Sequence, residues 1–212
     1  MRARLFEQKL TRVRKAFAII MLSTFMATGI ISCSNNKSLL VTEIKVSPPS
    51  RRIAKASKAG DFYIQGQSQH VKGDSQAAIA SFTQAISLNP NYAEAYNNRG
   101  NARSVMKDIN GAIDDFDQAI LLDSRYAIAY NNRGNARAAN GDPQAAIADY
   151  NEAIRLNPNF APAYNNRGNA RAANNDKQGA IADLQRAATI FERENNRQLY
   201  QEVMNNLKEL GQ

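Results

Sequence analysis

The chain has 212 residues, of which 43% are hydrophobic and 22% charged, and its one histidine and one cysteine exclude a multi-histidine metal site and an intramolecular disulfide. The net charge is +8, but residues 1–32 hold six basic residues against one acidic residue, so the remainder carries 21 basic and 18 acidic side chains. This near balance, without a basic stripe that carries aromatic residues, argues against nucleic-acid binding.

The N-terminal segment has the layout of a secretory signal peptide. A basic stretch over residues 1–15 precedes an apolar run over residues 16–31, which is short for a membrane-spanning helix of about 20 residues. Polar sequence begins just after this run. We therefore expect residues 1–32 to be a signal peptide, and the alternative is an uncleaved signal-anchor helix.

The cysteine stands where such a signal peptide would be cleaved. The sequence Ile30-Ile31-Ser32-Cys33 resembles the bacterial lipobox, in which an aliphatic, a variable and a small residue precede a cysteine. The resemblance implies cleavage before Cys33 and attachment of diacylglyceryl to its sulfur. Acyl chains contribute roughly 0.8 kcal/mol per buried CH₂, so we expect a lipid anchor in a membrane. The expected location is the bacterial cell envelope, on the periplasmic or external side.

A tether follows the anchor. Residues 33–58 show no sustained hydrophobic period and contain Pro48-Pro49 and Arg51-Arg52. A flexible chain of about 25 residues spans on the order of 25–30 Å. We expect this segment to hold the rest of the protein clear of the lipid surface.

From residue 59 to residue 192 the sequence repeats every 34 residues. The glycines Gly66, Gly100, Gly134 and Gly168 keep this step, and the string YNNRGNAR occurs three times. A period of this length is typical of stacked helical repeats, whose surfaces usually bind other macromolecules. We expect four units, at residues 59–92, 93–126, 127–160 and 161–192.

Each unit is predicted to be a pair of helices. In the second unit Tyr96, Gly100 and Arg103 share one helical face, and Ala112 and Phe116 share another. The turn between the two halves ends in aspartate, which caps a helix start because its carboxylate accepts free backbone N–H groups. These capping aspartates are Asp74, Asp108, Asp142 and Asp176.

The pattern within the unit resembles the tetratricopeptide repeat. It has an aromatic residue at position four, glycine at eight, alanine at twenty, an aromatic residue at twenty-four, alanine at twenty-seven and proline at thirty-two. The resemblance implies an all-α fold, a right-handed α-solenoid of four helix pairs. Residues 193–212 carry an apolar stripe that includes Leu199, Val203 and Leu207, so we expect a C-terminal capping helix over the last repeat.

Asparagine recurs at three positions of the last three units. The resemblance places the fifth and ninth positions on a concave groove and the sixth at its edge. An amide donates and accepts hydrogen bonds, so a ladder of amides could pair with the backbone of a bound peptide. The alternative is that the same side chains bond neighbouring helices. These asparagines are Asn97, Asn131 and Asn165 at the fifth position, Asn98, Asn132 and Asn166 at the sixth, and Asn101, Asn135 and Asn169 at the ninth.

Arginine occupies the seventh position of the same units, where members of the family usually carry leucine. Aspartate stands at their twenty-third position, whereas the first unit has Gln65 and Ser81, so both members change together. This predicts structural Arg–Asp pairs between the two helices, because a buried guanidinium needs a partner. The rival interpretation is an anion-binding row that includes Arg103, Arg137 and Arg171. The predicted pairs are Arg99 with Asp115, Arg133 with Asp149, and Arg167 with Asp183.

The sequence predicts a binding protein and not an enzyme. It shows no phosphate-binding loop, nucleophile elbow or catalytic carboxylate pair, and we expect no cofactor, metal site, small-molecule substrate or nucleic-acid partner. A clamp for acidic C-termini is also not expected, because the groove positions hold asparagine, Ile128 and Pro162 where such clamps use Lys and Arg. We expect a membrane-tethered adaptor that binds a peptide or protein. The alternative is a structural solenoid that assembles with copies of itself.

Overall fold

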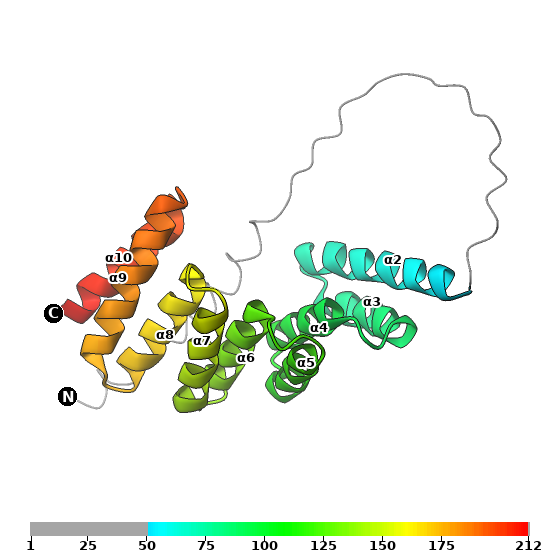
Figure 1. Cartoon of the computed structure of the whole chain (residues 1–212), viewed down its shortest axis with the longest axis horizontal. Coiled ribbons are helices and arrows are strands. Elements are labelled where there is room, and N and C mark those ends of the chain that lie inside the picture. The colour runs from blue at the N-terminus through cyan, green and yellow to red at the C-terminus, as the bar shows by residue number, and fades with distance from the viewer. Residues whose placement is uncertain (1–50, 212) are drawn as a thin grey trace, which may run out of the picture. The chain divides into compact units, whose positions relative to one another are not determined.

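The computed structural model describes residues 51–211, with side chains from Lys58 onward (Figure 1). The expected signal peptide, Cys33 and most of the expected tether lie outside the described residues. Within residues 51–211 all regular structure is helical. No helix in this part of the chain is long and apolar enough to cross a membrane.

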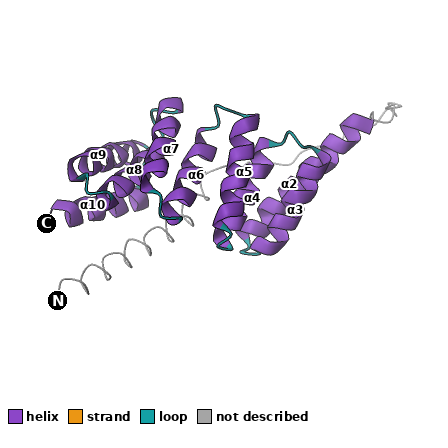
Figure 2. Ribbon diagram, turned by 90° about the horizontal axis from the view of Figure 1, so that it is seen from below, coloured by secondary structure: helices purple, strands orange, loops and turns teal. Residues whose placement is uncertain are grey.

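The described helices form four successive pairs and a final helix, in chain order (Figures 1 and 2). The expectation of an all-α solenoid of four helix pairs with a C-terminal helix is confirmed. The bounds are α2 Arg51–Val71 and α3 Ser75–Leu88; α4 Ala93–Val105 and α5 Ile109–Leu122; α6 Ala127–Ala139 and α7 Pro143–Leu156; α8 Ala161–Ala173 and α9 Lys177–Arg193; and α10 Arg197–Gly211.

The first helix differs from expectation at its start. α2 begins at Arg51 and has 21 residues, whereas α4, α6 and α8 have 13 each. The sequence places residues 51–58 in the tether because they lack the repeat pattern, but they continue the helix toward its N-terminus. The helix therefore begins eight residues before the expected boundary at residue 59.

The two helices of each pair pack closely through glycine. A Cβ atom at Gly100 would lie 2.7 Å from Cε1 of Phe116, and at Gly134 it would lie 2.6 Å from Cε1 of Tyr150. Real Cβ atoms essentially never approach another atom this closely. The absence of a side chain therefore allows the ring of the second helix to lie directly on the backbone of the first.

The turn within each pair uses a left-handed residue followed by an aspartate cap. Gly73 and Gly141 have φ of 84° and 88°, and the equivalent Lys107 and Asn175 have φ of 67° and 64°. Each following aspartate accepts a hydrogen bond at 2.9–3.0 Å from the backbone N–H three residues later. These turns satisfy the backbone groups that a helix end leaves without partners.

The first helices of successive pairs define one face of the array. α2 contacts α4, α4 contacts α6, and α6 contacts α8, in addition to the contacts of each with its neighbours in sequence. The second helices α3, α5, α7 and α9 do not approach one another to this extent. The first helices therefore line the inner side of the repeats.

The last helix covers the apolar end of the fourth pair. α9 has 17 residues against 14 in α3, α5 and α7, and its last turn carries buried Ile190 and Phe191. Val203 of α10 is 1% exposed, and Leu199 and Leu207 pack against the same cluster. This arrangement agrees with the role of a cap that removes apolar surface from water.

Candidate functional site

Asparagine side chains link successive repeats through a chain of hydrogen bonds. Asn166 of α8 donates from Nδ2 to Oδ1 of Asn131 on α6, at 3.0 Å. Asn132 of α6 donates in the same way to Asn97 on α4, also at 3.0 Å. The amide at the sixth position of one repeat therefore bonds to the amide at the fifth position of the repeat before it.

At the first interface this chain ends on a tyrosine. Asn98 of α4 donates from Nδ2 to the hydroxyl oxygen of Tyr63 on α2, at 3.0 Å. Gln67 donates to the same oxygen at 3.1 Å. Asn97 donates to Asn98 within α4 at 3.2 Å, so consecutive interfaces are connected. Tyr63 is thus held by two donors from two helices.

These contacts correct the expectation of an open amide ladder at the fifth and sixth positions. Asn97 and Asn166 are each 2% exposed, and Asn132 is the only one of the six that is not fully buried. Their amide groups bond to one another because the inner helices lie close together. They hold the repeats in register, which is the alternative that the sequence left open, and do not offer free groups to a peptide.

The chain of amides stops at the fourth repeat. The Oδ1 atom of Asn165 is buried and has no hydrogen-bond partner within the described residues. In the earlier repeats this atom accepts from a sixth-position asparagine, and α10 does not continue that pattern. The cap therefore covers the apolar end without completing the polar chain.

The ninth position differs from repeat to repeat. The hydroxyl of Tyr150 donates to Oδ1 of Asn135 at 2.8 Å, and Asn206 of α10 donates to Asn169 at 3.5 Å. Asn101 is partly exposed and has no hydrogen-bond partner in the described part of the chain. Asn101 is therefore the ninth-position side chain best placed to meet a ligand.

The arginines at the seventh position form the ion pairs that the sequence predicted. Arg133 donates from Nη2 to Oδ1 of Asp149 at 2.6 Å and from Nε to Oδ2 at 3.0 Å. The Asp149 side chain is 4% exposed, and the guanidinium also reaches Asp117 of the preceding pair at 2.6 Å. The same two-atom contact joins Arg99 to Asp115 and Arg167 to Asp183.

The arginines one turn later bind the same carboxylates. Arg137 donates to Asp149 at 2.9 Å, Arg103 to Asp115 at 2.9 Å, and Arg171 to Asp183 at 2.7 Å. Each buried aspartate therefore has two guanidinium partners. The eleventh-position arginines bond within the pair, so the structure does not support a free anion-binding row.

The first repeat uses a neutral version of this contact. Ser81 donates from its hydroxyl to Oε1 of Gln69 at 2.6 Å, while Gln65 is exposed. The sequence pattern links Ser81 to Gln65, at the seventh position of the first unit. In the structure the partner of Ser81 is Gln69, at the eleventh position.

A group of tyrosines on the inner side was missed by the sequence analysis. The rings of Tyr63 and Tyr92 lie with their centroids 4.8 Å apart, at an interplanar angle of 33°. Tyr92 and Tyr126 immediately precede α4 and α6, and Phe160 has the same place before α8. An aromatic residue at the thirty-fourth position of three units was the available signal.

Glu94, in the first turn of α4 and two residues after Tyr92, acts on these tyrosines through its charge. Burial raises the pKa of Tyr92, and the Glu94 carboxylate raises it further. Burial likewise raises the pKa of Tyr126 strongly, with added contributions from Tyr63 and then Glu94. Burial, Tyr92 and then Glu94 raise the pKa of Tyr63. We call Tyr63, Tyr92, Tyr126 and Glu94 the tyrosine–glutamate cluster.

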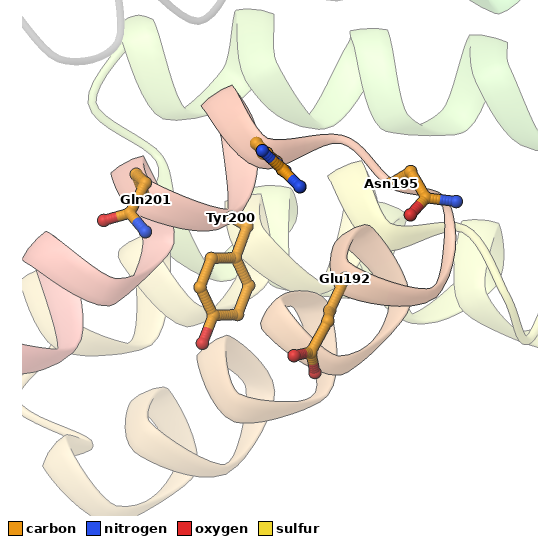
Figure 3. A pocket seen from close by; sticks show the side chains of 5 residues that line it. Glu192, Asn195, Tyr200 and Gln201 are labelled. Carbon is orange, nitrogen blue, oxygen red and sulfur yellow. The ribbon is translucent and has the colours of Figure 1, made fainter.

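A hollow of about 420 Å³ lies at the junction of α9 and α10. Glu192, Asn195, Arg197, Tyr200 and Gln201 line it, and Figure 3 shows the Glu192 and Tyr200 side chains projecting in the same direction. In the described residues no group of three or more His, Cys, Asp or Glu side chains is arranged to hold a metal ion. The hollow is open and of mixed polarity, which offers no defined chemistry for a ligand.

This architecture defines a helical-repeat protein whose class serves as a protein-interaction scaffold. Models described as tetratricopeptide repeat match residues 93–126, 127–160 and 149–182, and one described as TPR repeat matches residues 66–104. Together they span more than half of the chain. The chain belongs to the tetratricopeptide repeat family. No curated protein sequence matches it.

Several solved structures are similar to the described part. MamA is 26% identical over 68% of this chain and 84% of its own, with a TM-score of 0.61. The first TPR of Spaghetti (RPAP3), bound to the HSP90 peptide SRMEEVD, is 28% identical over 56% of this chain and 94% of its own, with a TM-score of 0.55. TTC0263, a thermophilic TPR protein of Thermus thermophilus, is 21% identical over 70% of this chain and 82% of its own. Its TM-score of 0.61 shows the shared fold.

Proposed function

We propose that the chain is a non-enzymatic adaptor, tethered through lipid on Cys33 to a membrane of the bacterial cell envelope, which binds a peptide or protein on the inner side of its repeats. The observation that carries the proposal is the continuous face formed by α2, α4, α6 and α8. On α4, Glu94 is exposed and Asn101 is partly exposed, and the buried amide chain fixes the spacing of the inner helices. A rigid inner face of this kind suits an extended partner.

The partner differs in chemistry from the acidic peptide that the RPAP3 domain binds. That peptide, SRMEEVD, carries three carboxylate side chains. At the second position of its repeats this chain has Glu94, Ile128 and Pro162, and its inner arginines are engaged with Asp115, Asp149 and Asp183. A negative charge on the inner face repels an acidic ligand.

The membrane tether is tested by metabolic labelling. The full chain and a Cys33→Ser variant are expressed in a bacterial host that is fed an alkyne fatty acid, and the membranes are then separated. The proposal predicts label and membrane retention for the natural chain and the loss of both in the variant. Membrane retention of a natural chain that carries no label would instead identify an uncleaved signal anchor.

The binding face is tested with two arginine substitutions in the same repeat. Asn101→Arg places a long charged side chain on the inner side, and Gln118→Arg places it on the exposed surface of α5. The full chains are purified from solubilised membranes. Both variants must give the same helical circular dichroism as the natural chain before their partners are compared. A partner lost by Asn101→Arg and kept by Gln118→Arg supports the proposal. A partner kept by both contradicts it, and a homo-oligomer without other proteins favours the self-assembling solenoid.

A further inference from the structure

We infer that the tyrosine–glutamate cluster is a binding site for one basic side chain, arginine or lysine, of the protein partner. The inference rests on the proposed function, because it specifies what the inner face recognises. The site lies where α2 meets α4, at the N-terminal end of the repeats.

The aromatic part of the site is fixed before any ligand arrives. The rings of Tyr63 and Tyr92 are 4.8 Å apart, and the Tyr63 ring also lies 5.9 Å from the buried ring of Phe82. The Tyr63 hydroxyl oxygen accepts hydrogen bonds from Asn98 and Gln67. Rings held in this way lose little conformational freedom on binding, and both remain partly exposed.

The acidic part of the site, Glu94, has no counter-ion among the side chains that the structure describes. Glu94 is exposed in the first turn of α4, two residues after Tyr92, and forms no ion pair with any basic side chain among the described residues. By contrast, the carboxylates of Asp115, Asp149 and Asp183 each have two arginine partners. An arginine or lysine of a partner would supply the positive charge that no side chain described from Lys58 onward supplies to Glu94.

The combination of rings and carboxylate selects a cation. An aromatic face attracts a positive group through its quadrupole, and a carboxylate beside it adds a direct charge interaction. The chain itself pairs the same groups elsewhere: the guanidinium of Arg99 lies 5.4 Å from the ring centroid of Tyr96, and that of Arg133 lies 5.4 Å from Tyr130. An acidic side chain would be repelled, and an apolar one would leave the carboxylate without a partner.

The site occurs once in the repeats, whereas the amide chain joins the second, third and fourth repeats. The residue equivalent to Glu94 is Ile128 in the third repeat and Pro162 in the fourth, and the residue equivalent to Tyr63 is asparagine in both. A single charged site at one end of a repetitive face gives an extended partner a defined direction. It also sets the position of the partner along the inner helices.

The test uses the full chain in detergent and libraries of randomised ten-residue peptides. The central residue is fixed as arginine, lysine, glutamate or citrulline, which has the shape of arginine without its charge. We expect arginine and lysine libraries to be retained about tenfold more than the citrulline library. Glu94→Gln and Tyr92→Ala should each reduce this preference below about threefold.

Glu192→Gln is the matched control, because it removes the same charge from the hollow between α9 and α10. It should keep the full preference, and a loss of preference in this variant would overturn the inference. Retention of all libraries without preference would also overturn it, while leaving the proposed function intact. Failure to retain any library, by a chain with natural circular dichroism, would contradict peptide binding itself.

Discussion

Gly134 of α6 lies directly under the ring of Tyr150 of α7, and a Cβ atom at residue 134 would be 2.6 Å from Cε1 of that ring. Tyr150 is fully buried and cannot move aside without opening the helix pair. We expect Gly134→Ala to lower the free energy of unfolding by about 1–3 kcal/mol, as overpacking of a filled core does. Urea denaturation followed by circular dichroism measures the change.

Gly60 provides the control for this substitution. It lies in α2, and a Cβ atom there would have no heavy atom within 4 Å. Gly60→Ala should leave stability unchanged or raise it by up to about 1 kcal/mol, because alanine favours the helix. Equal stability of Gly134→Ala and the natural chain would refute the packing role of the glycine.

The buried Arg–Asp contacts predict that neutralising one aspartate lowers the stability of the fold strongly. Asp149 accepts from Arg133 and Arg137, so Asp149→Asn leaves two guanidinium groups without their carboxylate. We expect a loss of about 3 kcal/mol in the free energy of unfolding. Glu152→Gln breaks the Arg155 pair on the surface and should change stability little. Similar losses of unfolding free energy in the two variants would show that the buried Asp149 pairs stabilise the fold no more than the surface pair does.

The amide chain predicts that an interior asparagine is structural. Asn131→Ala removes the acceptor of Asn166 and the donor to Asn132, and it leaves a buried amide without a partner. The expected cost is about 1–3 kcal/mol. Asn101→Ala, which breaks no hydrogen bond among the described residues, should cost less than about 0.5 kcal/mol. A smaller loss of unfolding free energy for Asn131→Ala than for Asn101→Ala would contradict a structural role of the amide chain.

Lys107 adopts a backbone conformation that suits glycine. Its φ is 67°, whereas the equivalent turns at residues 73 and 141 use glycine. Lys107→Gly should raise the free energy of unfolding by up to about 1 kcal/mol, and Gly141→Lys should lower it by a similar amount. Thermal unfolding of the two variants measures both effects. Two shifts of the same sign would exclude backbone strain as their cause.

The buried tyrosines predict a loss of stability at alkaline pH. Burial raises the pKa of Tyr150, so the folded protein keeps this proton at a pH where the unfolded chain releases it, near 10. The contribution is complete below about pH 10 and decreases as the pH rises toward the folded pKa, by at most about 1.4 kcal/mol per pH unit. Tyr150→Phe should weaken this dependence in urea titrations from about pH 9 to about pH 11.5. An unchanged slope would show that Tyr150 does not contribute.

The sequence predicted the fold because the fold is periodic. Glycine and alanine at fixed positions, with aspartate at each turn, specify the helix pair locally, and the correlated change at Gln65 and Ser81 indicated the Arg–Asp contact. It did not predict the start of α2, because residues 51–58 carry no repeat pattern. The hydrogen-bond partners of Asn97 depend on the spacing between neighbouring inner helices, which no single unit determines.

The most direct test of the account is a photo-crosslinker placed at Asn101 in the full chain, in living bacterial cells, with Gln118 as the comparison position. Crosslinked proteins are identified by mass spectrometry after purification. The account predicts a defined partner protein from position 101 and none from position 118. The same products from both positions, or products from position 118 alone, would contradict binding on the inner face of the repeats.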